Sequence, residues 1–336
     1  MDSDPMDFRQ LPDLAVRTLG GGVVYANDEA FAARENLISP GPAAFDPSDF
    51  GHKGKVYDGW ETRRRRESGF DTAIVRLGAP GVVRGVVIDT SWFTGNYPPE
   101  VSLEGLAVAG QPSVADLLAA RRWEPLLARA AIKGDTANAF AVTSERRVTH
   151  VRLRIFPDGG VARLRVHGEP LPDPALLDAL GTVDLAAMEF GGRVTGCSNL
   201  FYSSPNNLLL PGPPRSMAEG WETARRRDDG NDWVEVALAG ESTIAVAELD
   251  TTYFLHNAPG WATLRGRVGA GEWFPLIPRT ALSPDTRHRI VLRDVPAVDA
   301  VRLDIHPDGG MARLRLFGAL TPGGREALGG RWMRAV

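Results

Sequence analysis

The sequence predicts an all-β protein with two tandem β-sandwich domains, and three observations support this fold class. Three motifs occur twice in the same order along the 336-residue chain: residues 58–66 return as 219–227, residues 89–96 as 250–257, and residues 157–165 as 307–315. Short runs of apolar residues alternate with charged ones, and 37 glycines and 25 prolines separate the runs. A repeat of about 150 residues has the size of a whole domain rather than of a solenoid unit, so each copy is expected to fold around its own core.

The strand predictions come from the spacing of the apolar residues. Residues 151–155, 164–166 and 301–305 alternate aliphatic with polar side chains, which places the aliphatic ones on one face of a strand. Residues 82–88 form a β-branched run that is typical of a more buried strand. Sheets with one buried and one solvent-facing side pack in pairs, which is the β-sandwich arrangement.

Helical signal is weak. A short helix is expected at residues 114–121, in a region that the second copy shortens, and a linker helix or turn at residues 172–180. The predicted organisation is an N-terminal arm at 1–20, a first repeat at 21–170, a linker at 171–182, a second repeat at 183–320 and a C-terminal tail at 321–336. No strand is expected in the tail.

Composition excludes several classes of partner. A hydrophobic content of 43% with 24% charged residues is typical of a globular protein, and a net charge of −4 gives no general attraction to nucleic acid or to an anionic membrane. The single cysteine, Cys197, excludes an internal disulfide and a cysteine-built zinc site. The first residues are acidic and form no secretion signal, and no apolar run reaches the length of about 18 residues that a membrane span needs. We therefore expect a cytoplasmic protein.

The first motif joins a Gly-Trp-Glu-Thr sequence to a run of arginines, four in the first copy (Arg63, Arg64, Arg65 and Arg66) and three in the second (Arg225, Arg226 and Arg227). In an extended segment Glu61, Arg63 and Arg65 would point one way, and Thr62, Arg64 and Arg66 the other. One set would then pair with structural acids while the other binds a ligand carboxylate. The alternative is a solvated charge run with a network of structural ion pairs.

The other two motifs also carry polar groups. Asp89 and Asp250 end a buried strand where it meets a loop, a common place for site residues. Asn96 and Asn257 either donate to an oxygen of a ligand or close a turn on their own backbone. The Pro-Asp-Gly-Gly sequences at 157–160 and 307–310 predict a turn that joins two strands in a hairpin. No histidine recurs in the aligned motifs, so a site used by both copies cannot depend on histidine.

Taken together, the three doubled motifs resemble those of the allantoicase family, over roughly residues 20–320. The resemblance implies two jelly-roll β-sandwiches similar to galactose-binding domains. It also implies hydrolysis of allantoate to ureidoglycolate and urea, a step of purine (allantoin) breakdown for nitrogen use, by a homo-oligomer.

Residue roles follow from this chemistry. Cleaving a C–N bond of allantoate needs one group that protonates the departing urea nitrogen and one that accepts a proton. The candidates for these roles are Glu61 and Asp89 in the first copy and Glu222 and Asp250 in the second. The candidates for substrate binding are Arg63, Arg64, Arg65, Asn96, Arg225, Arg226 and Asn257. No cofactor is required; a divalent metal such as Mn²⁺ could polarise a ureido carbonyl, but no spacing of ligands in the sequence calls for one.

Three alternatives remain open at this stage. The chain could be a non-catalytic tandem ligand-binding β-sandwich, because a fold does not fix a function. It could hydrolyse a related ureido acid, or be a degenerate structural subunit, because the second copy departs from the family pattern at residues 253–256. Only 5 tyrosines are present, few for the stacking surface of a sugar-binding site.

Overall fold

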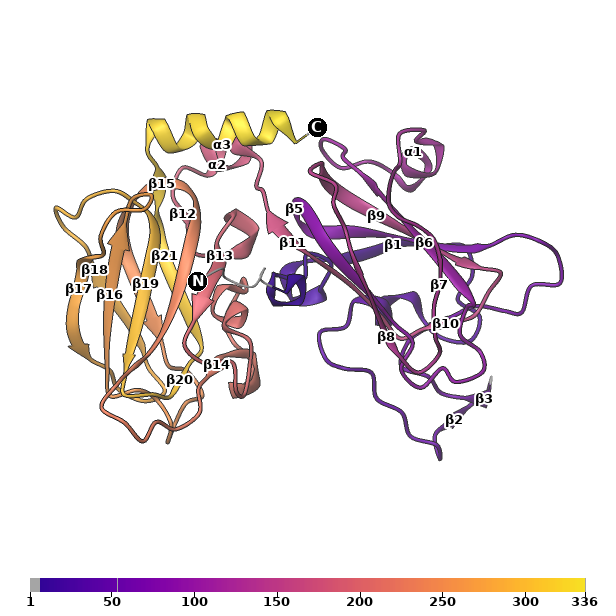
Figure 1. Cartoon of the computed structure of the whole chain (residues 1–336), viewed down its shortest axis with the longest axis horizontal. Coiled ribbons are helices and arrows are strands. Elements are labelled where there is room, and N and C mark those ends of the chain that lie inside the picture. The colour runs from indigo at the N-terminus through magenta and orange to yellow at the C-terminus, as the bar shows by residue number, and fades with distance from the viewer. Residues whose placement is uncertain (1–6, 53, 336) are drawn as a thin grey trace. The chain divides into compact units, whose positions relative to one another are not determined.

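The computed structural model describes residues 7–52 and 54–335 (Figure 1). Contacts between residues divide the chain into two compact units, the first ending at Glu169 and the second running from Pro170 to Arg334. Each unit is a β-sandwich of the jelly-roll class, which confirms the predicted fold. Among the described residues, no helix is long and apolar enough to cross a membrane.

The main sheet of the first unit has the strand order β1-β5-β9-β6-β7, and two further strands, β8 and β11, pair with β5. The strands are β1 (Gly22–Ala26), β2 (Phe50–Gly51), β3 (Gly54–Lys55), β4 (Trp60–Glu61), β5 (Asp71–Asp89), β6 (Glu100–Leu106), β7 (Glu124–Ala131), β8 (Ala137–Ala141), β9 (Arg147–Phe156), β10 (Gly160–Val161) and β11 (Arg163–Pro170). Two short ladders, β4–β10 and β2–β3, lie outside this sheet.

The second unit repeats this arrangement. Its main sheet has the order β12-β21-β15-β19-β16-β17, with β13 and β18 also paired to β15 and a separate β14–β20 ladder. The strands are β12 (Val183–Asp184), β13 (Arg193–Cys197), β14 (Trp221–Glu222), β15 (Asp232–Asp250), β16 (Trp261–Arg267), β17 (Phe274–Ala281), β18 (Arg287–Val291), β19 (Val298–His306), β20 (Gly310–Met311) and β21 (Arg313–Leu320).

One 19-residue strand in each unit takes part in both layers of the sandwich. In the second unit, β15 pairs with β19 from Asp232 to Ala237 and then with β21 and β18 as far as Asp250. The strand changes partners near residues 238–242, where its register shifts, so it connects the two layers. The predicted alternation is present in β9, where Val151, Leu153 and Ile155 are fully buried between more exposed neighbours.

Both expected helices are present, as α1 (Val114–Ala119) and α2 (Pro174–Leu180). In the described ranges six short 3₁₀ helices accompany them, namely Phe8–Gln10, Arg17–Leu19, Arg34–Ile38, Met188–Phe190, Pro205–Leu209 and Met217–Glu219. The described part of the predicted N-terminal arm packs on the first unit, because Leu14 and Ala15 are fully buried.

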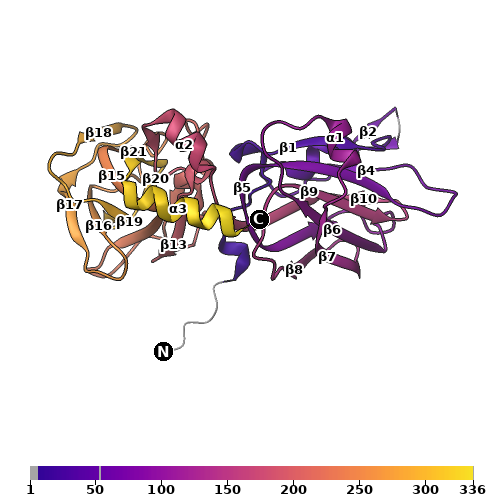
Figure 2. The same ribbon diagram turned by 90° about the horizontal axis from the view of Figure 1, so that it is seen from above.

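The sequence did not predict the helix α3 (Pro322–Arg334), which forms most of the C-terminal tail. Figures 1 and 2 show it beside α2, and it also packs on β15. Four glycines lower the helix propensity of this segment. Gly324 has a packing reason, because a Cβ there would lie 2.1 Å from the carbonyl oxygen of Glu241 in β15.

The Pro-Asp-Gly-Gly turn is present, but the prediction that it forms a hairpin is wrong. The turn follows β9, and the short strand after it, β10, pairs with β4 rather than with β9. In the second unit β20 pairs with β14 in the same way. The turn therefore lies directly against the strand that carries Glu61 or Glu222.

Candidate active site

The Trp-Glu pair that both repeats contain is fixed from the buried side of the sandwich. Trp60 is fully buried, and its indole Nε1 donates a hydrogen bond of 2.7 Å to the carbonyl oxygen of Asp28. In β4, Glu61 pairs with Gly160. The N–H of Thr62 donates to the carbonyl oxygen of Gly159 at 3.2 Å. The N–H of Gly159 donates in turn to Thr62 Oγ1, also at 3.2 Å. The backbone on both sides of Glu61 is therefore held in place.

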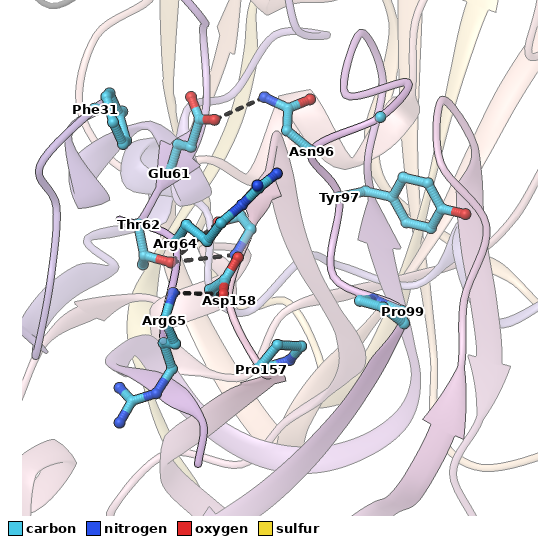
Figure 3. Close-up of a pocket in the computed structure, with 12 residues that line it drawn as sticks. Phe31, Glu61, Thr62, Arg64, Arg65, Asn96, Tyr97, Pro99, Pro157 and Asp158 are labelled. Atoms are coloured by element: carbon cyan, nitrogen blue, oxygen red, sulfur yellow. Dashed lines mark hydrogen bonds between the residues drawn. The ribbon is translucent and has the colours of Figure 1, made fainter. Parts of the chain in front are cut away.

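A pocket of about 540 Å³ opens beside Glu61 in the first unit (Figure 3). Its walls come from β4 and the arginine run, the loop after β5, and the turn after β9. The residues that line it are Phe31, Glu61, Thr62, Arg64, Arg65, Gly95, Asn96, Tyr97, Pro99, Pro157, Asp158 and Gly159.

The carboxyl group of Glu61 is partly buried in the wall of this pocket. Burial raises the pKa of Glu61 above its usual value, and a hydrogen bond from Asn96 opposes that shift. The Asn96 Nδ2 lies 2.7 Å from Glu61 Oε1. A carboxyl group with a raised pKa keeps its proton to higher pH, which suits a general acid.

Asn96 does not close a turn with its side chain. Its amide donates to Glu61, while its backbone carbonyl oxygen accepts a hydrogen bond of 2.7 Å from the N–H of Gly160. The loop that carries Asn96 is thus tied to the turn after β9.

The arginines of the first copy divide into two groups. Arg63 donates from Nε to Asp28 Oδ2 at 2.7 Å, and Arg65 donates from Nη1 to Asp71 Oδ1 at 2.7 Å. Both are ion-paired, as the sequence predicted for one set of side chains. Arg63 does not line the pocket, and Figure 3 shows the guanidinium of Arg65 pointing away from Glu61.

Arg64 is the arginine that is available to a ligand. It lines the pocket, is exposed, and has no hydrogen-bond or ion-pair partner within the described part of the chain. Figure 3 shows it extending across the pocket towards Asn96. The predicted strand alternation, which put Glu61 and Arg64 on opposite faces, is wrong here because β4 ends at Glu61.

Asp89 and Asp250 do not line this pocket or reach Glu61 and Glu222. Asp89 Oδ1 accepts hydrogen bonds from the N–H and the Oγ of Ser91, at 2.8 and 2.6 Å. Asp250 accepts the equivalent bonds from Thr252, at 2.8 and 2.5 Å, and lies 3.4 Å from Arg287. Both carboxylates thus hold the turn that follows their strand.

Several lining residues were not predicted as site candidates from the sequence, among them Phe31, Tyr97 and Asp158. Phe31 and Tyr97 lie outside any strand, so no periodicity identified them. Asp158 belongs to a repeated motif that the sequence analysis interpreted as a turn.

The second unit contains the same polar arrangement. Asn257 Nδ2 donates to Glu222 Oε1 at 2.6 Å, and Arg226 donates to Asp232 Oδ1 at 2.9 Å. Arg225, the counterpart of Arg64, is exposed and has no partner among the residues that the structure describes. Each repeat therefore combines an acid, an amide and an available arginine.

The surroundings of that arrangement differ between the repeats. Asn257 Nδ2 also lies 3.5 Å from the sulfur of Met217. His256 and Ala258 flank Asn257, where Gly95 and Tyr97 flank Asn96. The second repeat thus has Ala258 at the position of Tyr97 and His256 at the position of Gly95.

No group of three or more His, Cys, Asp or Glu side chains in the described ranges is arranged to hold a metal ion. Asp71 and Asp232, the first residues of β5 and β15, are buried and hold Arg65 and Arg226.

The fold and the site define a class: tandem β-sandwiches in which an asparagine amide holds a carboxyl group in each repeat, with an available arginine in the pocket of the first. Comparison with known proteins identifies the family. A family model described as "Allantoicase repeat" matches residues 12–171 and again residues 183–321. The chain therefore belongs to the allantoicase family.

Individual relatives agree over the full length. A "Probable allantoicase" of Nocardia farcinica is 60% identical over 318 residues, covering 94% of this chain and 96% of that protein. One from Ralstonia nicotianae is 40% identical, covering 95% and 98%. The crystal structure of allantoicase from Saccharomyces cerevisiae has a TM-score of 0.80 at 34% identity, covering 92% of this chain and 93% of that one.

Proposed function

We propose that this protein is an allantoicase, which hydrolyses allantoate to ureidoglycolate and urea. The observation that carries the proposal is the pocket of the first repeat, where an acid with a raised pKa and an available arginine share one cavity in a chain of this family.

The pocket has complementary groups for each part of the substrate. Allantoate carries a carboxylate and two ureido groups on one carbon. The guanidinium of Arg64 is free to hold the carboxylate with two parallel hydrogen bonds. The proton of Glu61 faces a departing nitrogen, and Asn96 orients the Glu61 carboxyl group through its hydrogen bond at 2.7 Å.

The products identify the bond that breaks. Urea leaves intact and the other product carries a new hydroxyl group, so the bond between the central carbon and one nitrogen is cleaved. Attack at a ureido carbonyl would instead release a carbamate. The lone pair of the remaining ureido nitrogen can expel urea while Glu61 protonates the departing nitrogen, and water then adds to the resulting C=N bond.

We assign hydrolysis to the first repeat. Among the described side chains, the Asn96 amide donates a hydrogen bond to Glu61 alone. The Asn257 amide donates to Glu222 and also contacts the sulfur of Met217. Tyr97 also gives the first pocket a wall that Ala258 cannot form. The second repeat keeps the polar groups in altered surroundings.

The experiment is urea release from allantoate by the purified protein in H₂¹⁸O, before and after chelation and then with added Mn²⁺. We expect urea in every arm and ¹⁸O in the hydroxyl group of ureidoglycolate. Absence of urea in every arm would favour a ligand-binding β-sandwich. Release that requires Mn²⁺ would contradict a mechanism built on the side chains alone.

The family resemblance also supports two finer proposals, a homo-oligomeric assembly and a cytoplasmic location. Light scattering of the purified protein tests the first, and fractionation of cells that express it tests the second.

A further inference from the structure

Proton transfer in the proposed reaction uses a second acid–base group besides Glu61, and Asp89 does not supply it in this pocket. Expelling urea requires one group that gives a proton and one that takes the N–H proton of the remaining ureido arm. Asp89 is held by Ser91 in the turn after β5. Among the lining residues, the acids are Glu61 and Asp158.

We propose that Asp158 is the second catalytic carboxylate of the first repeat, acting as the base that pairs with Glu61 as the acid. This inference rests on the proposed function. The assignment gives the aspartate of the Pro-Asp-Gly-Gly motif a chemical role. A turn of this kind can also form with other residues at that position.

The position of Asp158 is fixed relative to Glu61 through the backbone. Glu61 pairs with Gly160, and the N–H of Arg65 donates to Asp158 Oδ2 at 2.7 Å. Asp158 Oδ1 has no hydrogen-bond partner in the described part of the chain and so remains available to a ligand. Figure 3 shows Glu61 and Asp158 in one cavity, with Arg64 extending between the turn and Asn96.

Two glycines bring this turn close to the loop of Asn96. Gly159 has a positive φ of 140°, and a Cβ there would lie 2.8 Å from the carbonyl oxygen of Asn96. A Cβ on Gly160 would lie 2.0 Å from the ring of Phe93. The Asp158 carboxylate is therefore carried on a tightly packed support, as a preorganised catalytic group requires.

The proposed steps balance. As the bond between the central carbon and nitrogen breaks, Glu61 gives its proton to the departing nitrogen, and Asp158 takes the N–H proton of the remaining arm as the C=N bond forms. Urea leaves. Water then adds to the carbon of the C=N bond and loses a proton to the Glu61 carboxylate, while Asp158 returns its proton to the nitrogen. Both side chains recover their starting states.

The test is the substitution Asp158→Asn, which keeps an oxygen to accept the N–H of Arg65 but removes the charge. We expect kcat to fall by at least about 100-fold, with KM within about threefold and an unchanged melting temperature. Asp135→Asn is the matched control, because Asp135 also accepts a backbone N–H, that of Trp92 at 2.8 Å, and does not line the pocket. That variant should turn over like the wild type.

A second variant separates catalysis from folding. In Asp158→Ala, added formate should restore part of the lost turnover, while formate should not raise the turnover of Asp135→Asn or of the wild type. The inference fails if Asp158→Asn turns over like Asp135→Asn, or if formate restores nothing to a folded Asp158→Ala enzyme. Lack of urea release by the wild type would instead remove the proposed function itself.

Discussion

The two repeats hold their Trp-Glu segment in the same backbone arrangement, but the residues around its polar groups differ. Glu61 and Glu222 each follow a fully buried tryptophan and accept a hydrogen bond from an asparagine, at 2.7 and 2.6 Å. The difference lies around the asparagine, where the first repeat has Tyr97 and the second has Met217 against the amide. Retention of a motif in both copies therefore indicates a shared framework, while the residues around it differ.

Part of the shared framework is an ion pair that forms within each repeat without a ligand. Arg65 with Asp71, and Arg226 with Asp232, join the arginine run to the first residue of a long strand, at 2.7 and 2.9 Å. Side chains of both acids are almost completely buried, so the arginine is needed to keep a carboxylate in the sandwich. This explains one repeated arginine without reference to function.

Another pair shows how the two copies differ without loss of fold. The charged pair of Asp28 and Arg63 corresponds to the neutral pair of Asn199 and Ala224. Asn199 Oδ1 accepts the N–H of Ala224 at 3.2 Å, as Asp28 Oδ1 accepts the N–H of Arg63 at 3.1 Å. The backbone contact is therefore the common element, and the ion pair is an addition of the first copy.

The largest expected effect separates the two acids. Glu61→Gln removes the proton donor while keeping the shape of the side chain, so kcat should fall by at least about 100-fold. Glu222→Gln should lower kcat by less than about tenfold, because hydrolysis is assigned to the first repeat. Steady-state urea release measures both. Equal losses in the two variants would mean that the repeats contribute equally.

A smaller effect is expected on the pH profile. The hydrogen bond from Asn96 lowers the pKa of Glu61 against the upward effect of burial. Removing it in Asn96→Ala therefore raises the pKa of Glu61 further, and an acid catalyst stays protonated to higher pH. The alkaline limb of kcat/KM should move to higher pH. A limb that stays in place, or moves down, would show that another group sets it; Asn257→Ala is the matched comparison.

The smallest expected effect concerns the extra ion pair of the first repeat. The Arg63 side chain is 73% exposed, and exposed ion pairs contribute about 0.2–1 kcal/mol. A double-mutant cycle with Arg63→Ala and Asp28→Asn, measured by denaturant unfolding, should give a coupling energy in that range. A coupling energy above about 2 kcal/mol would contradict the view that the backbone contact, rather than the ion pair, stabilises this segment.

Much of the fold could be predicted because periodicity reports burial directly. The strands containing residues 82–88, 151–155 and 301–305 are all present, as are both short helices. The helix α3 was missed because its four glycines lower the helix propensity of the segment, and one of them, Gly324, allows close packing against β15. Long-range packing of this kind leaves no local signal.

The site was predicted in part. Glu61, Arg64 and Asn96 are brought together in one pocket, since the repeat singled them out. Asp89 was placed with them because the sequence shows where a strand ends but not where its last side chain points. The hydroxyl group of Ser91 donates a hydrogen bond to the Asp89 carboxylate, and that of Thr252 donates to Asp250 in the other copy. An acid followed two residues later by Ser or Thr is a local turn signal that carries this information.

The central claim is that the pocket of the first repeat holds the substrate carboxylate on Arg64. It is tested most directly by calorimetric binding of allantoate to the Glu61→Gln enzyme, in which turnover is slow. Adding Arg64→Ala should weaken binding by at least about tenfold, the loss expected for a charge-assisted hydrogen bond. Adding Arg225→Ala, or Arg66→Ala as a neighbouring arginine outside the pocket, should change the affinity by less than about twofold. Binding that survives Arg64→Ala and is lost in Arg225→Ala would contradict the account and place the substrate in the second repeat.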